Sequence, residues 1–218
     1  MTEEDESSKL SEYGLHRLIA ISDGVFAFAI TLLVLDLTVP VLSSGASSAD
    51  LWQALSKEWV SFLSYLTSFF IAGVWWNAHN INFRFIRDSD STLRWLNLVF
   101  LLWIALLPFF TKILDEYNTL QIAVALYATD QAFAGIFMCL SWWHASRNHR
   151  LVDKNLKNSV IRFRLLSNAL PPLFFIISIG LSFISPLIAT YSWFVMIPVF
   201  ILARRLRRES TADKYERF

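Results

Sequence analysis

The stretch from Ser22 to Asp36 constrains the chain more than any other feature, because it has an apolar interior and a carboxylate near each end. Asp23 and Asp36 are 13 residues apart, which is roughly 20 Å on a helix that rises about 1.5 Å per residue. The hydrocarbon core of a bilayer is about 30 Å thick, so a helix spanning it here carries at least one carboxylate at membrane depth. An acid that faces lipid is costly, and we therefore expect protein or water to shield this helix.

The composition of the whole chain supports a membrane location. Of the 218 residues, 55% are hydrophobic and 17% are charged, which is too apolar for an ordinary water-soluble domain and long enough for several spans. The single cysteine, Cys139, excludes an internal disulfide and a cysteine-built metal site, and we expect it to be a small buried hydrophobic residue.

One stripe of the first helix is apolar. At about 100° per residue, the stripe comprises Ile21, Gly24, Phe28, Leu32 and Leu35, with Thr31 at its edge. Asp23 lies on roughly the opposite side, so we expect the acidic side to meet neighbouring helices. The stripe could face lipid, a partner helix or a pore. Lipid is the least favoured of the three, because Gly24 and Thr31 are small or polar residues typical of helix contacts.

Six apolar segments predict an all-α membrane protein with six transmembrane helices. The segments cover about 17–38, 59–80, 94–114, 120–144, 162–184 and 186–204. We expect a transmembrane domain at 17–206 between an acidic N-terminal tail at 1–16 and a C-terminal tail at 207–218. Prolines inside the third, fifth and sixth segments predict local kinks or breaks.

The basic residues predict the orientation in the membrane. Of the 19 Lys and Arg residues, 17 lie in or next to the two tails and the loops after the second and fourth segments, some of them at the segment ends that border these regions, which leaves Lys57 and Lys112 on the other side. Because basic residues gather on the cytosolic side, we expect both termini to be cytosolic. The basic clusters then act as topology signals and contacts with lipid headgroups, and no nucleic-acid partner is expected.

The segment RLIAISDGVFAFAITLLVLD, which contains Arg17, Ser22 and Asp23, resembles the first-helix signature R-x-x-x-F-S-D of the transmembrane protein 175 family. The members of this family are potassium-permeable channels of endolysosomes and prokaryotes. Ile21 stands where the family usually has Phe. Because the chain has one set of six segments, it resembles the single-repeat prokaryotic form, which implies an integral protein of a prokaryotic cell membrane.

The resemblance implies a homotetramer with a central pore lined by the first helix. Phe28, Thr31, Leu32 and Leu35 would form the pore lining and a hydrophobic gate for K⁺ and other monovalent cations, with Asp36 at the pore mouth. The family usually has an aliphatic residue at the position of Phe28. The aromatic ring could narrow the gate, or it could force a different rotamer or rotation of the helix.

The polar residues of the signature are expected to support the helix and not to touch the ion. Arg17, Ser22 and Asp23 would form a structural polar network with His79, because Trp76–His79 resembles a tryptophan-and-histidine pattern in the family's second span. The alternative for His79 is an interfacial histidine hydrogen-bonded to a loop.

The sequence lacks the motifs of several other classes. It contains no T-V-G-Y-G filter and none of the common nucleotide-binding, zinc-protease or hydrolase motifs, so we expect no enzyme and no cofactor beyond the permeant K⁺. His144 and His149 have no obvious acidic or cysteine partners, and no resident metal is expected.

Asp130, near the middle of the fourth segment, supports an alternative function. It could be a structural carboxylate held by hydrogen bonds, or the ion or proton site of a proton-coupled secondary transporter with a broken fifth helix. A membrane scaffold without transport activity is the third possibility, but it does not account for the first-helix signature.

Overall fold

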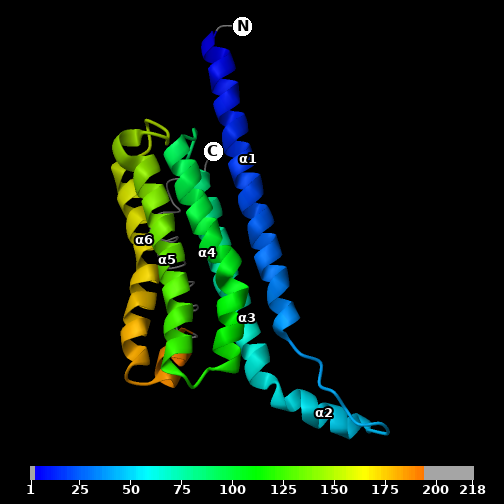
Figure 1. Ribbon diagram of the computed structural model, residues 1–218. Coiled ribbons are helices and arrows are strands. Elements are labelled where there is room, and N and C mark those ends of the chain that lie inside the picture. Colours follow the sequence, from blue (N-terminus) through cyan, green and yellow to red (C-terminus); the bar gives the residue numbers. More distant parts are fainter. Residues whose placement is uncertain (1–2, 194–218) are drawn as a thin grey trace, which may run out of the picture.

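The computed structural model describes residues 3–193, and side chains are described for residues 13–193; over this part the fold is a bundle of helices (Figure 1). The helices are α1 (Glu3–Leu32), α2 (Ser48–Lys57), α3 (Trp59–Phe83), α4 (Ser91–Glu116), α5 (Gln121–Ser146) and α6 (Asn158–Ser182). Two short 3-10 helices, η1 (Leu33–Asp36) and η2 (Arg147–His149), continue α1 and α5.

Within the described residues, five helical segments are long and apolar enough to span a membrane. They are Tyr13–Asp36, Trp59–Phe83, Ser91–Glu116, Gln121–His149 and Asn158–Ser182, and they overlap the first five predicted spans. Most of the predicted sixth span, 186–204, and the whole predicted tail at 207–218 lie outside the described residues. The helix α1 begins at Glu3, so most of the predicted N-terminal tail at 1–16 is helical.

The segment between the first two spans contains a helix that was not predicted. A capping box starts α2: the backbone N–H of Ser47 donates to Asp50 Oδ2 at 2.8 Å, and the Asp50 N–H donates to Ser47 Oγ at 3.3 Å. None of the α2 residues is buried. The helix points away from the bundle at the end where α1 finishes (Figure 1).

The best-buried helix of the subunit is α5, which packs against α4 on one side and α6 on the other (Figure 1). In its most apolar window 61% of the residues are buried, against 28% for α1. The first helix packs on α3 and α4 at the edge of the bundle. Within the described part of the subunit, protein therefore shields α1 on one side only, which is less than its two carboxylates led us to expect.

The prolines do not interrupt the helices that contain them. Pro108 lies inside α4, and Pro171 and Pro172 lie inside α6, both of which continue as single helices. The prediction of a broken fifth span is therefore wrong. Pro171 and Pro172 are buried, and a Cβ added at Gly135 of α5 would lie 2.7 Å from Pro172 Cβ and Cδ. The missing side chain of Gly135 thus allows α5 and α6 to approach closely at the proline pair.

At one end of the bundle, Asp90 joins the segment after α3 to the end of α5. Its Oδ1 accepts the Leu93 N–H at 2.8 Å, which caps α4, and its Oδ2 lies 2.8 Å from His144 Nε2 and 3.3 Å from Arg150 Nε. The expectation that His144 has no acidic partner is wrong, because 54 residues of chain separate two groups that the fold brings into contact. Burial alone would raise the pKa of the Asp90 carboxyl, but the Leu93 N–H, His144 and Arg150 together hold that pKa below its usual value.

We expect Gly135→Ala to lower the free energy of unfolding by about 1–3 kcal/mol, because its methyl group would overlap Pro172. The matched control is Gly180→Ala in α6, where a Cβ would have nothing within 4 Å. Thermal unfolding of both variants in one detergent checks this, and equal midpoints would contradict the proposed close approach.

We expect Asp90→Asn to remove a pH-dependent part of the stability. A carboxylate whose pKa is lower in the folded protein stabilises it above the unfolded pKa of about 3.9, and this contribution is lost as the pH falls further. Asparagine still caps α4, so only the charge-dependent contacts are lost. The free energy of unfolding of the wild type should therefore exceed that of the variant by about 1 kcal/mol at neutral pH, and this difference should disappear below about pH 4. Denaturant unfolding from pH 3 to 7 measures this difference. The control is Asp153→Asn, which removes an exposed acid from the same end of the bundle.

Candidate functional site

One face of α1 is buried against the bundle. The buried side chains between residues 13 and 36 follow a helical spacing of three or four residues; they are Leu15, Leu18, Ser22, Phe26, Ala29 and Leu33. This face meets α3 and α4. The spacing shows that a single stripe of the helix attaches it to the rest of the subunit.

The predicted apolar stripe of α1 is exposed. The side chains of Phe28 and Leu35 are 68% and 72% exposed, Ile21 and Thr31 are also exposed, and Leu32 is half-buried. The Thr31 hydroxyl lies 2.9 Å from the carbonyl oxygens of both Ala27 and Phe28, so its hydrogen is used within the helix and only its oxygen lone pairs face outward. Residues 13–193 thus leave the apolar stripe uncovered, with one oxygen acceptor at its edge.

Asp36 lies at the end of this stripe but turns towards α4. Its Oδ1 is 4.0 Å from Lys112 Nζ, and 20% of its side chain is exposed. Among the described residues, its Oδ2 is buried without a hydrogen-bond partner. The ammonium group of Lys112 offsets part of the negative charge that we expected Asp36 to contribute to a pore mouth.

Three buried polar side chains connect α1, α3 and α4. Asn97 of α4 donates from Nδ2 to Ser22 Oγ at 2.9 Å, and its Oδ1 lies 2.9 Å from His79 Nε2. Ser22 in turn donates to the Leu18 carbonyl at 2.8 Å. Because an amide oxygen only accepts, Nε2 of His79 must carry a hydrogen. We call Ser22, His79 and Asn97 the polar brace.

Aromatic rings pack around the polar brace. The His79 ring stacks on Phe83 with centroids 4.1 Å apart and lies parallel to Phe100 at 5.7 Å, while Phe26 of α1 is 6.1 Å away. These rings exclude water from the hydrogen bonds of the brace, and a hydrogen bond left unmade there would be expensive. The rotation of α1 about its own axis is therefore closely fixed.

Asp23 and Arg17 of the signature lie outside the polar brace. Asp23 is exposed, and its Oδ1 accepts the Trp76 indole N–H at 2.9 Å, which adds a second contact between α1 and α3. The Arg17 guanidinium lies 5.9 Å from the ring centre of Tyr13, one turn away on the same helix. The structure thus brings Ser22 and His79 together, attaches Asp23 to Trp76, and leaves Arg17 apart.

Sequence reasoning missed Asn97, the central residue of the brace. A signal was present, because Asn97 stands inside an apolar segment of membrane-spanning length, where an asparagine requires hydrogen-bond partners. No local pattern identifies these partners, so the asparagine could not be placed beside the first helix.

Asp130 lies inside the subunit, away from the exposed stripe. Its Oδ2 accepts from Gln131 Nε2 at 2.6 Å, and Gln131 Oε1 accepts the Trp75 indole N–H at 2.7 Å. Among the described residues, Asp130 Oδ1 is buried and has no hydrogen-bond partner. These contacts hold Asp130 in place and leave one oxygen available to a proton or an ion.

A family model described as the endosomal/lysosomal potassium channel TMEM175 matches residues 17–108, which include the second half of α1, all of α2 and α3, and most of α4. A protein of Streptomyces collinus named as a potassium channel is 33% identical over 195 residues, covering 84% of this chain and 93% of that protein. The mouse endosomal/lysosomal proton channel TMEM175 is 31% identical over 139 residues, covering 58% of this chain and 27% of that protein.

A solved structure supports the fold over almost as much of the chain as the Streptomyces relative covers. The crystal structure of a lysosomal potassium-selective channel TMEM175 homolog from Chamaesiphon minutus superposes with a TM-score of 0.76 at 29% sequence identity. The match covers 88% of this chain and 98% of that one. The similarity thus extends well beyond the first-helix signature.

We expect Asn97→Ala to lower the free energy of unfolding by about 1–2 kcal/mol, because it leaves the Nε2–H of His79 without an acceptor inside an apolar layer. The control is Asn77→Ala, an exposed asparagine of α3. Thermal unfolding in the same detergent compares the two variants, and an equal loss in both would remove the structural role of the brace.

Proposed function

The chain belongs to the TMEM175 family, and from this membership we propose that it is a potassium-permeable cation channel. Its bacterial relative of nearly equal length is named as a potassium channel, and the relatives are ion channels, not enzymes. The observation that carries the proposal is the exposed apolar stripe of α1, which no helix of the described subunit covers.

Assembly of four copies would turn this stripe into an ion path. A subunit that is attached through one face of α1 leaves the opposite face free to meet symmetry-related copies. Four such helices around one axis would place Phe28, Thr31, Leu32 and Leu35 along a shared pore. The partners of the chain are then its own copies, the lipid bilayer and monovalent cations.

We propose a hydrophobic gate at the level of Phe28, Leu32 and Leu35. Rings of apolar side chains dewet a narrow pore, and a small rotation or dilation of the α1 helices would admit a mostly dehydrated cation. The outward lone pairs of Thr31 Oγ1 offer that cation an oxygen contact. The chain contains no T-V-G-Y-G segment, so a carbonyl filter of that kind is not part of the proposal.

The polar brace supports this gate from behind. Since Ser22, His79 and Asn97 fix the rotation of α1, they determine which side chains face the axis. Asp23 adds to this through Trp76, whereas Arg17 lies over Tyr13 of the same helix and takes no part in the brace. These residues act on the pore by positioning α1 and not by touching the ion.

The chain is an integral membrane protein, and we propose that it lies in a prokaryotic cell membrane with both termini cytosolic. The basic loops at 84–90 and 147–157 would then lie in the cytosol. Asp36 and Lys112 would lie at the opposite, extracellular mouth, where the pair moderates the attraction of Asp36 for cations.

We expect Phe28→Ala to increase K⁺ leak through liposomes containing the protein by about tenfold, as lowering a barrier by about 1.4 kcal/mol would. Phe109→Ala is the control, because Phe109 is an exposed phenylalanine on α4 outside the stripe. Potassium efflux at matched protein content measures the leak, and unchanged flux in Phe28→Ala would exclude Phe28 from the gate.

A proton-coupled transporter remains the second candidate, because Asp130 keeps one buried oxygen without a partner among the described residues. It would show saturable flux that is driven by a proton gradient and is abolished by Asp130→Asn. A channel would instead conduct K⁺ without a proton gradient, and Asp130→Asn would leave that conduction in place.

A further inference from the structure

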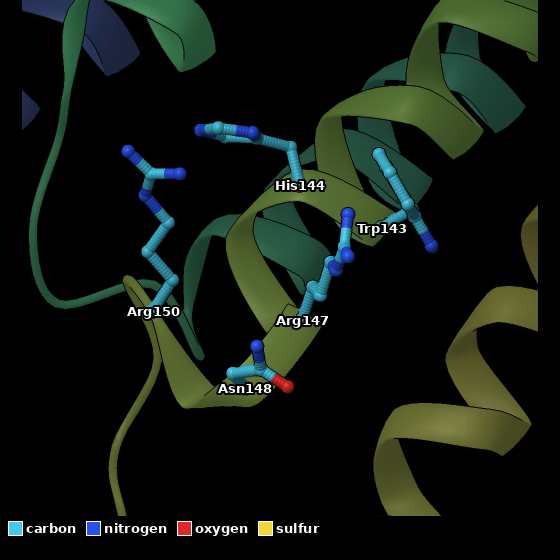
Figure 2. A pocket seen from close by; sticks show the side chains of 5 residues that line it. All are labelled: Trp143, His144, Arg147, Asn148 and Arg150. Carbon is cyan, nitrogen blue, oxygen red and sulfur yellow. The ribbon is translucent and has the colours of Figure 1, made fainter.

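A basic pocket lies at the end of α5, far along the chain from the α1 stripe. Trp143, His144, Arg147, Asn148 and Arg150 line it, and its volume is about 330 Å³ (Figure 2). Figure 2 shows the Arg150 side chain on the side of His144 and the Arg147 side chain on the side of Trp143, at the end of α5. None of these residues takes part in the proposed pore.

The backbone after α5 brings the two arginines to one pocket. Asn148 and His149 have φ of 53° and 52°, the left-handed region that turns the chain sharply. The Leu151 N–H then donates to the Ala145 carbonyl at 2.9 Å, so the chain folds back on the last turn of the helix. Arg150 consequently returns to the side of α5 that carries His144.

The charges of the pocket favour an anion. Asp90 is the acid that contacts it, and its Oδ2 is already engaged by His144 Nε2 and Arg150 Nε. The Arg150 side chain is nevertheless 60% exposed, and the Arg147 guanidinium lies over the Trp143 ring at 5.1 Å. Two arginines thus line the pocket, and only Arg150 is shown paired with Asp90 among the described residues. Guanidinium N–H groups match the geometry of phosphate oxygens.

The exposed strip of α5 leads from the membrane into this pocket. Although most of α5 is buried, Phe133, Leu140, Trp143 and Arg147 are exposed and lie on one face of the helix. Their order is apolar, apolar, indole, cation, which matches the acyl chains, the interface and the headgroup of a phospholipid. A free anion would need only the cationic group, Arg147, and not the apolar residues and the indole before it.

We propose that this pocket binds a phosphate group, donated by the headgroup of an anionic phospholipid whose acyl chain lies along Phe133 and Leu140. Arg147 and Arg150 donate hydrogen bonds to the phosphate oxygens, and Asp90 orients Arg150 through Nε. The inference depends on the membrane setting of the chain and not on its conduction of K⁺.

The test titrates the purified full chain in detergent with dioleoylphosphatidylglycerol, dioleoylphosphatidylcholine or inorganic phosphate, and counts bound molecules by native mass spectrometry. Wild type should bind the anionic lipid more tightly than the neutral one. Arg147→Gln, which leaves the Asp90–Arg150 pair intact, should weaken binding of the anionic lipid about tenfold. Arg147→Lys should restore part of that loss.

The matched control is Arg84→Gln/Lys154→Gln, which removes two exposed charges from the same end of the bundle. Loss of anionic-lipid binding in Arg147→Gln alone, without competition by inorganic phosphate, supports the lipid as the source. If inorganic phosphate competes with the lipid, and if Arg147→Gln weakens that competition, a free phosphate is supported as the source. Equal binding in Arg147→Gln and the control, with normal thermal unfolding of both, would overturn the site.

Discussion

The structure depends on the pair of hydrogen bonds through which Asn97 joins Ser22 to His79. Both lie in an aromatic layer closed by Phe83 and Phe100, where an unmade bond has no water to replace it. Rotation of α1 by one residue would turn Ser22 away and break the contact. The brace therefore fixes the rotation of α1 about its axis, and so determines which face of α1 remains outside the subunit.

The outward face follows from this constraint. Since Leu18, Ser22, Phe26 and Ala29 are buried, the positions on the other side of the helix have no neighbour within the described subunit. Among the described helices α5, and not α1, is the best buried. It contacts α4 and α6 and approaches Pro172 at Gly135. A tightly packed scaffold with one edge helix suits a protein whose function arises between copies.

The sequence by itself determined the class of the protein, the approximate spans and the apolar stripe of α1. These features depend on local periodicity and on the length of apolar runs, both of which are visible in one chain. The family resemblance at Trp76–His79 predicted a polar network between His79 and the first helix, and in the structure Asn97 lies between His79 and Ser22. Even α2 has a local signal, because Ser47 and Asp50 form a capping box at its start.

Only the tertiary structure decided which polar groups meet. Asn97 lies 75 residues from Ser22, and Asp90 lies 54 residues from His144, so neither pairing leaves a trace in local spacing. The tertiary structure also placed Asp36 beside Lys112 and carried α6 unbroken through its prolines. Hydrogen bonds and close packing act over a few ångströms in space, whereas periodicity reports only on neighbours along the chain, and this is why the two sources determined different parts of the protein.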